Sequence, residues 1–214
     1  MNRAAKARLQ LRAVAVLRAL KQSRTYDELA AETELPAGDL NRYVNGHVLP
    51  SVERARAVVE GTGREAVVAE LEDRIRLDEE GYVDNSRVVF DQSFLDILAT
   101  VVAADFDDPA PDAVLTAATD GITFGAALAS HLGARVAYAK KSRETAVEEF
   151  VEARDRVVDD LVRSGETQTL LLDIAERAGA TVVGVAALIA AGDEGLSRAR
   201  ARVDAPVAAL VGTE

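Results

Sequence analysis

The segment Val157–Thr167, VVDDLVRSGET, places two carboxylates directly before a short loop that contains a glycine. Asp159 and Asp160 could accept hydrogen bonds from the vicinal hydroxyls of a ribose. The loop Arg163–Glu166 would present successive backbone N–H groups to an anion, and a helix beginning at Thr167 would add its positive N-terminus. A sugar phosphate satisfies both halves of this pattern.

Side chains within the loop favour the same ligand. Ser164 and Thr167 could add hydroxyl donors, and Gly165 would let a phosphate approach the backbone closely because it has no Cβ atom. Glu166 is unfavourable beside a phosphate, so we expect its side chain to point away. The predicted ribose-phosphate site comprises Asp159, Asp160, Arg163, Ser164, Gly165, Glu166 and Thr167.

The elements around this segment indicate how it would be held. Short apolar runs bounded by turn residues are typical of buried parallel strands, and here they alternate with helical stretches. The pattern predicts an α/β fold, a doubly wound parallel sheet whose ligands bind beyond the carboxyl ends of its strands. The expected strands are Ala113–Ala117, Arg135–Tyr138, Arg156–Val158, Thr181–Ala190 and Val207–Val211, and the expected helices are Ile122–Leu132 and Thr167–Ala178.

The order of these motifs resembles the type I phosphoribosyltransferases. VVDDLVRSGET is similar to their signature for phosphoribosyl pyrophosphate (PRPP), in which an apolar strand, Asp-Asp and a small polar residue precede Gly-x-Thr. Thr116–Phe124 (TAATDGITF) resembles their pyrophosphate loop, and Tyr138–Lys141 (YAKK) resembles the strand end that carries a basic pyrophosphate ligand. The resemblance covers roughly residues 82–211 and implies PRPP, bound with Mg²⁺, as a ligand. The implied pyrophosphate residues are Ala118, Thr119, Asp120, Gly121, Lys140 and Lys141.

One departure from that family bears on catalysis. Only Ser142–Arg156 separates Lys141 from Val157, whereas the enzymes have a flexible loop and a full strand there. Either that loop is absent from the protein, or residues are missing from this sequence. The loop of the enzymes closes over PRPP and excludes water. The short segment Ser142–Arg156 and the predicted strand of only three residues before Asp159 both count against transferase activity in this chain.

Residues 1–63 have the pattern of a small helical domain. Ala4–Leu20 has apolar residues at helical spacing, and Thr25 with Glu28 forms a capping box for a second helix, Tyr26–Glu32. A short turn leads to a third helix, which has Pro36 at its first position and runs to about Asn45. Val52–Glu60 is the fourth. Two short helices joined by such a turn form a helix-turn-helix unit.

Residues 26–51, YDELAAETELPAGDLNRYVNGHVLPS, resemble the lambda-repressor-like (XRE-type) DNA-binding domain. The resemblance implies that Ala37–Asn45 is the recognition helix. Asn can pair with adenine, and Arg with guanine or a phosphate, whereas Asp39 would repel a phosphate unless it reads a cytosine amino group. The implied DNA-facing residues are Asp39, Asn41, Arg42 and Asn45. The alternative is a four-helix accessory or dimerisation domain.

Composition narrows the class of protein. The chain of 214 residues has no cysteine, which excludes disulfides and thiolate metal sites, and no apolar run long enough for a membrane span. We therefore expect a cytoplasmic protein with no resident metal. The net charge of the chain is −11, yet residues 1–60 carry a net charge of +3, as expected if only this N-terminal part binds a polyanion. Arginine far outnumbers lysine, and with the abundant Asp and Glu this composition resembles that of a salt-adapted microbe such as an archaeon.

We therefore expect a helix-turn-helix domain over residues 1–63, a connecting helix over 64–81 and a phosphoribosyltransferase-like domain over 82–214. The arrangement resembles purine-type phosphoribosyltransferase regulators of halophilic archaea. The favoured hypothesis is a homodimeric DNA-binding transcriptional regulator of nucleotide metabolism that senses PRPP, a purine base or a nucleotide, and the pattern leaves transferase activity open. The alternative is a purine (adenine or hypoxanthine-guanine) phosphoribosyltransferase whose front domain serves dimerisation or autoregulation.

Overall fold

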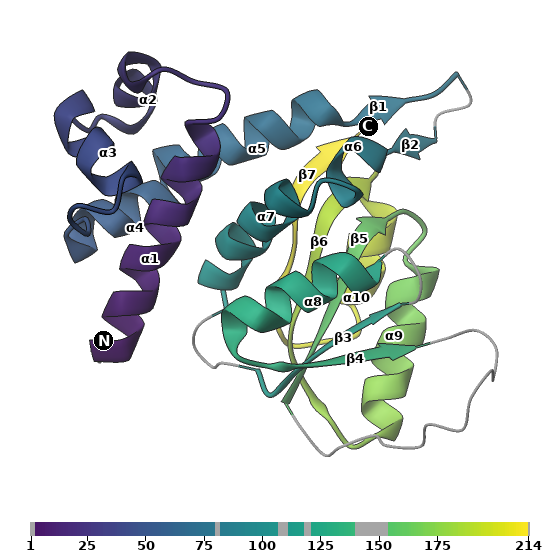
Figure 1. Ribbon diagram of the computed structural model, residues 1–214. Coiled ribbons are helices and arrows are strands. Elements are labelled where there is room, and N and C mark those ends of the chain that lie inside the picture. The colour runs from purple at the N-terminus through teal and green to yellow at the C-terminus, as the bar shows by residue number, and fades with distance from the viewer. Residues whose placement is uncertain (1–2, 80–81, 107–110, 118–120, 140–153, 214) are drawn as a thin grey trace.

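The computed structural model describes residues 3–79, 82–106, 111–117, 121–139 and 154–213, and for 154–160 it describes the backbone alone. A group of helices precedes a parallel sheet that is covered by helices on both faces (Figure 1). None of the described helices is long and apolar enough to cross a membrane. The α/β class predicted from the alternation of strands and helices is confirmed.

The N-terminal helices follow the predicted order and caps. Their bounds are α1 (Arg3–Leu20), α2 (Tyr26–Thr33), α3 (Ala37–Val44), α4 (Val52–Glu60) and α5 (Thr62–Arg74). The capping box is present, because the Thr25 N–H donates to Glu28 Oε2 at 2.7 Å and the Glu28 N–H donates to Thr25 Oγ1 at 3.3 Å. Ser51 caps α4 by accepting a single hydrogen bond from the Arg54 N–H at 3.2 Å.

The region between α5 and the sheet differs from the connecting helix expected over residues 64–81. The α5 helix ends at Arg74, and the next residues form a small antiparallel hairpin, in which Arg76 pairs with Asp84 and Leu77 with Val83. Ile75 is buried at the end of α5 and adopts an extended backbone, which terminates the helix there. The elements of this region are β1 (Arg76–Leu77), β2 (Val83–Asp84), α6 (Ser86–Val89) and α7 (Gln92–Ala104).

The body is a five-stranded parallel sheet in the order β4-β3-β5-β6-β7. Its elements are β3 (Ala113–Ala117), α8 (Gly121–Leu132), β4 (Arg135–Ala139), β5 (Arg154–Val162), α9 (Glu166–Arg177), β6 (Thr181–Ala191), α10 (Glu194–Arg200) and β7 (Val207–Thr213). Successive residues of a strand point to opposite faces. Val114 accordingly packs in a cluster with Phe124 of α8, and Leu115 packs in a cluster with Leu171 of α9.

The central strand β5 corrects the prediction of a three-residue strand. It covers nine residues, so Asp159 and Asp160 lie within the strand and not in a loop after it. The register places Asp159 opposite Ala187 and Val162 opposite Ala190 of β6. β5 pairs with β3 on one side and with the long, mostly buried β6 on the other, and this backbone pairing outweighs the weak strand preference of aspartate.

One hydrophobic core joins the N-terminal helices to the body. Leu17 of α1 and Leu98 of α7 are completely buried in the same cluster as Leu128 of α8. A hydrogen bond from Arg12 Nη2 to the backbone carbonyl of His131, at 3.1 Å, ties α1 to the end of α8. The helical part is therefore packed against the sheet's own layer of helices.

Candidate functional site

The carboxyl ends of the neighbouring strands β4, β3 and β5 lie at one edge of the sheet, and in the chain each strand is followed by a segment that the sequence singled out. In the order β4-β3-β5 all three strands run parallel, and Ala117 at the end of β3 pairs with Ala139 at the end of β4. The pyrophosphate-loop segment follows β3, the basic segment follows β4 and the loop of the predicted ribose-phosphate site follows β5. Ligands of open α/β sheets bind at this edge.

The loop between β5 and α9 ends at a helix N-terminus with little internal capping. Gly165 is the N-cap of α9 and has a left-handed backbone, with φ 77°. Within the described part of the chain, no side chain caps the helix. The hydrogen bond from the Glu166 N–H to Ser164 Oγ is long, at 3.4 Å, and therefore weak. The α9 helix has 12 residues, and its first backbone N–H groups have little internal capping, so its N-terminus is suited to bind an anion.

Gly165 has a different role from the one expected. A Cβ atom on Gly165 would lie 2.8 Å from the Cα and 2.9 Å from the carbonyl oxygen of Gly195, at the start of α10. A Cβ atom on Gly195 would in turn lie 2.6 Å from the carbonyl oxygen of Arg163. The prediction that Gly165 opens the backbone to a phosphate is therefore incomplete, because its Cβ direction is filled by another backbone segment. Sequence reasoning missed Gly195, which only the tertiary contact reveals.

The other residues of this loop lie together at its surface. Arg163 and Glu166 are exposed, and Ser164 and Thr167 are half-buried. The exposed position of Glu166 leaves its charge in solvent. The side chains of Asp159 and Asp160 lie outside the described residues, although their backbone lies in β5, a few residues before the loop.

Of the pyrophosphate-loop residues, Gly121 is described and begins α8 as a buried residue. Ala118, Thr119, Asp120, Lys140 and Lys141 lie outside the described residues. Thr116, near the end of β3, is completely buried, and its Oγ1 has no hydrogen-bond partner among the described residues. A buried hydroxyl without a partner is costly. Thr116 was not among the predicted site residues, although it opens the motif.

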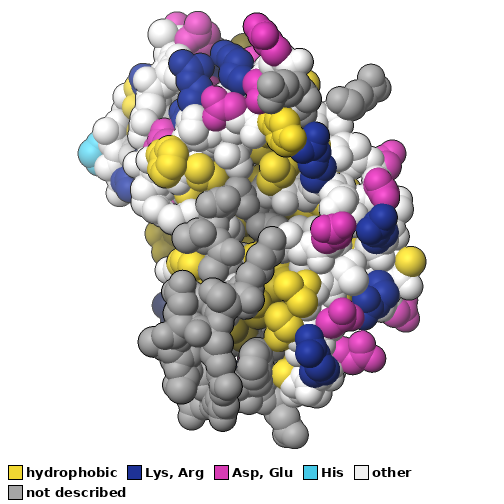
Figure 2. Space-filling view, turned by 90° about the vertical axis from the view of Figure 1, so that its right-hand side faces the viewer, with side chains coloured by type: hydrophobic (Ala, Val, Ile, Leu, Met, Phe, Trp, Pro, Cys, Tyr) yellow, Lys and Arg dark blue, Asp and Glu magenta, His cyan; other side chains and the backbone are white. Residues whose placement is uncertain are grey.

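The hairpin β1–β2 approaches the loop after β5. The guanidinium carbon of Arg163 lies 4.6 Å from the ring centroid of Tyr82. Sequence reasoning did not foresee this contact, because the two residues are 81 positions apart. On the face shown in Figure 2, acidic and basic side chains are interspersed and hydrophobic side chains form several small groups.

Comparisons with known proteins show which family the chain belongs to. No protein-family model matches the chain. The sequence is 31% identical over 153 residues to the xanthine phosphoribosyltransferase of Lactobacillus delbrueckii subsp. bulgaricus, a match that spans 56% of this chain and 80% of the relative. The chain belongs to the phosphoribosyltransferase family.

Solved structures agree with the phosphoribosyltransferase fold. Adenine phosphoribosyltransferase of Trypanosoma brucei superposes with a TM-score of 0.61 at 13% identity, covering 68% of this chain and 79% of that one. The enzyme of Thermoanaerobacter pseudethanolicus gives 0.60 at 19% identity over 68% of this chain and 99% of its own. Orotate phosphoribosyltransferase of Mycobacterium tuberculosis gives 0.59 at 18% identity, over 70% and 87%. At these identities the likeness shows the fold alone, and it confirms the expected type I phosphoribosyltransferase-like sheet.

The helices that precede the phosphoribosyltransferase body hold the second predicted site. The three residues between α2 and α3 make a tight turn in which Glu34 adopts a left-handed backbone, with φ 56°. Leu29 and Leu40, one from each helix, are completely buried and fix the angle between them. The XRE-type assignment of residues 1–63 stays a prediction.

The structure explains how α3 tolerates its acidic residue. Arg54 Nη1 donates to Asp39 Oδ2 at 2.7 Å and to Tyr43 Oη at 2.6 Å. The hydrogen bonds to Tyr43 and to Asp39 raise the pKa of Arg54. Asp39 is therefore neutralised by a cation on α4. Asn41, Arg42 and Asn45 are exposed, but the Asn45 amide already donates to the Asn41 carbonyl at 2.8 Å.

Proposed function

We propose that the phosphoribosyltransferase body binds PRPP or a purine nucleotide at the loop between β5 and α9. The observation that carries the proposal is this loop, in which an uncapped helix N-terminus and a left-handed Gly165 follow a central parallel strand that contains Asp159 and Asp160. The backbone N–H groups and Ser164 would hold the 5-phosphate. The two aspartates would hold the ribose hydroxyls.

The pyrophosphate of PRPP would lie over the neighbouring ends of β3 and β4. The Thr116 hydroxyl, which has no hydrogen-bond partner among the described residues, and the start of α8 support an anion there, and residues 118–120 with Lys140 and Lys141 would supply further contacts. Mg²⁺ prefers oxygen ligands from one or two carboxylates together with substrate phosphates. Asp159 and Asp160 are suited to hold it, and the ion would neutralise charge on the pyrophosphate.

We further propose purine phosphoribosyl transfer as the reaction of this site. A purine nitrogen would form a bond to C1 of the ribose while the bond from C1 to the pyrophosphate oxygen breaks, and pyrophosphate would leave with the electron pair as the purine loses a proton. The xanthine phosphoribosyltransferase relative supports a purine acceptor. The full length of β5 removes one of the two arguments against activity that the sequence offered.

Isothermal titration with PRPP and Mg²⁺, together with pyrophosphate release in the presence of xanthine, hypoxanthine, guanine or adenine, tests the proposal. We expect PRPP to bind the wild type, and the double variant Asp159→Asn with Asp160→Asn to bind it at least about tenfold more weakly, because charge-assisted hydrogen bonds are lost. Arg198→Ala, an exposed change on α10, is the matched control. Binding without pyrophosphate release would leave a sensor, and absence of both would refute the site.

A DNA-binding regulator is a second candidate function, favoured by the geometry of α2 and α3. The turn at Glu34, the exposed Arg42 and the neutralised Asp39 support α3 as a recognition helix. A homodimer would then place two such helices at a fixed spacing. A gel shift on the gene's own upstream DNA, over a series of salt concentrations with and without PRPP, tests this. We expect Arg42→Ala to weaken binding and to lower the salt slope by about one if Arg42 contacts a phosphate. An unchanged affinity and slope would count against the assignment.

A further inference from the structure

The contact between Tyr82 and Arg163 joins the hairpin to the predicted phosphate loop. The hairpin holds Tyr82 in place through Asp78, whose N–H donates to the Tyr82 carbonyl at 3.0 Å and whose Oδ1 accepts from the Tyr82 N–H at 2.7 Å. Both bonds fix the backbone directly beside the ring. The ring is therefore anchored on a paired segment and not on a free loop.

Much of the Tyr82 ring remains accessible. Tyr82 is 54% exposed even with the guanidinium of Arg163 lying over it. An aromatic ring that is held in place and half-exposed can stack a planar ligand, and stacking of a nucleobase on an aromatic side chain tolerates any base. Tyr82 by itself would therefore add affinity without selecting among bases.

Arg163 carries hydrogen-bond donors that could distinguish one base from another, which the Tyr82 ring cannot do. A guanidinium that lies over an aromatic ring uses its face, so its N–H donors stay available at its edge. Within the described part of the chain no carboxylate pairs with Arg163, whereas Arg198 and Arg202 of the body are bound to Glu194 and Asp173. Its cation is thus available beside the predicted ligand site.

Arg163 lies between the loop that would hold the phosphate of a nucleotide and the hairpin that would hold its base. It directly precedes Ser164 and Gly165, whose loop would hold the phosphate. Its long side chain carries the guanidinium away from those backbone groups and toward the hairpin, where it meets Tyr82. A ligand with a phosphate in the loop and a planar base at the hairpin would contact both.

We propose that Tyr82 and Arg163 read the base of the ligand and select a 6-oxopurine over a 6-aminopurine. The inference rests on the proposed phosphoribosyl function. Arg can donate two hydrogen bonds to the O6 and N7 acceptors of a 6-oxopurine, whereas the amino group of adenine is itself a donor and opposes the guanidinium. Tyr82 holds the guanidinium and stacks the base.

Titration of the full chain with inosine 5′-monophosphate, adenosine 5′-monophosphate and ribose 5-phosphate tests this inference. We expect the wild type to bind the inosine nucleotide about tenfold or more tightly than the adenosine nucleotide. Arg163→Ala should abolish this preference, and the ratio of the two nucleotide affinities is the readout, because loss of the charge also weakens binding of ribose 5-phosphate. Arg163→Lys should also lose most of the preference, because an ammonium keeps the charge but lacks the planar fork.

Substitutions of the ring test both contributions of Tyr82. Tyr82→Leu should weaken both nucleotides and the inosine nucleotide more, because it removes the stacking surface and the ring over which the guanidinium lies. Tyr82→Phe should preserve both affinities because it keeps the ring. Arg135→Ala, an exposed arginine at the amino end of β4, is the control for loss of positive charge. Equal wild-type affinities for the two nucleotides, with ribose 5-phosphate still bound, would overturn the inference and leave the proposed function standing. Failure of all three ligands to bind would overturn both.

Discussion

At Gly165 the backbone conformation and the packing both require the absence of a side chain. The left-handed φ of 77° is unfavourable for any residue with a Cβ atom, and the backbone of Gly195 occupies the space that such an atom would need. Gly195 has the reciprocal restriction, since its own Cβ atom would meet the Val162 side chain at 2.5 Å. These two glycines therefore set the position of the predicted phosphate loop against α10.

We expect Gly165→Ala to destabilise the fold by more than Gly179→Ala. Gly179 also has a positive φ, of 70°, but no atom lies within 4 Å of its Cβ position, so its variant bears only the backbone cost of about 1 kcal/mol. Gly165→Ala adds a collision with backbone, and we expect a loss of about 2–4 kcal/mol. Urea unfolding followed by circular dichroism measures both. Equal losses would show that the contact with Gly195 adjusts at no cost.

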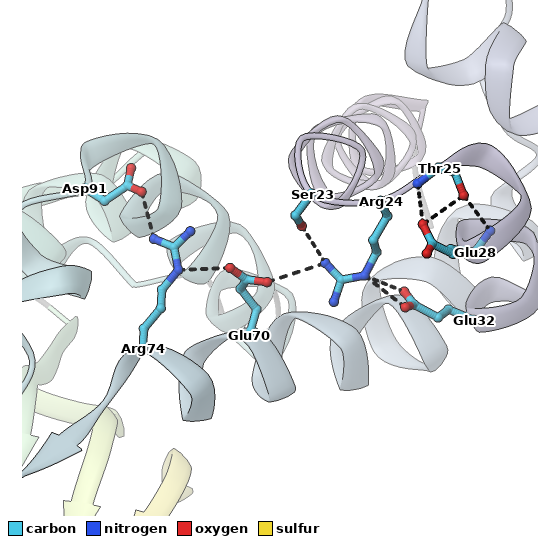
Figure 3. Close-up of polar contacts among 8 residues, drawn as sticks. All are labelled: Ser23, Arg24, Thr25, Glu28, Glu32, Glu70, Arg74 and Asp91. Atoms are coloured by element: carbon cyan, nitrogen blue, oxygen red, sulfur yellow. Dashed lines mark hydrogen bonds and ion pairs between the residues drawn. The ribbon is translucent and has the colours of Figure 1, made fainter.

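At the scale of elements, a chain of ion pairs links the turn between α1 and α2 to α2, to α5 and to the N-cap of α7 (Figure 3). Glu70 of α5 accepts from Arg24 at 3.5 Å and from Arg74 at 3.1 Å, and Arg74 also donates to Asp91 at 2.7 Å. Arg24 in turn pairs with Glu32 of α2. The guanidinium of Arg74 lies over the Phe94 ring at 3.9 Å, so the chain of ion pairs is anchored on the helix that covers the sheet.

Asp91 has two roles in this chain of ion pairs that two variants can separate. It pairs with Arg74, and it caps α7 by accepting from the Phe94 N–H at 3.0 Å. Asp91→Ala loses both interactions, and we expect a loss of about 1–2 kcal/mol at pH 7. Asp91→Asn keeps a good capping side chain and should lose less. Similar losses for both variants would contradict a capping role.

The pH dependence of the same site follows from its pKa. The hydrogen bond from Arg74 lowers the pKa of Asp91 in the folded protein. The stabilisation by the ionised carboxylate is therefore fully present above the unfolded pKa and is lost as the pH falls through the folded pKa. We expect the difference in unfolding free energy between wild type and Asp91→Asn to shrink in the acidic range below about pH 4, the usual pKa of aspartate. A difference that is constant from pH 7 to pH 3 would refute this.

At the scale of the whole molecule, the N-terminal helices and the phosphoribosyltransferase body share one core. The cluster that contains Leu17 of α1 also contains Leu98 of α7, Leu128 of α8 and Leu188 of β6. Segments joined by a common core unfold together. This packing gives a direct physical route by which a ligand in the body could bias the position of α3, because α1 contacts both α7 and α3.

We expect Leu17→Ala to destabilise the whole chain by about 2–5 kcal/mol, because it removes a completely buried side chain. Leu11→Ala in the same helix is the matched control, since Leu11 is 58% exposed and should change stability by less than about 1 kcal/mol. Hydrogen exchange should show α3 and β6 losing protection together in Leu17→Ala. Loss of protection in α3 alone would show that the helical part opens independently.

Local sequence patterns were sufficient to predict much of the fold. Thr25 and Glu28 predict the start of α2, and the short apolar runs predict β3, β4, β6 and β7, because capping and burial act on residues that are close in sequence. The order of three loop motifs also predicted the family. The end of α5 and the hairpin after it were missed, since the periodicity of residues 64–78 is helical throughout and gives no sign of β1.

The sequence by itself therefore determined the α/β class, the phosphoribosyltransferase resemblance and the loop Arg163–Thr167, since each depends on residue types at short spacing. The tertiary structure alone decided the length of β5, because its Asp-Asp pair becomes strand only when β6 supplies backbone partners. It also decided the contacts of Gly165 with Gly195, of Asp39 with Arg54 and of Arg163 with Tyr82. These contacts depend on how separate elements pack, and no local preference of the chain encodes them.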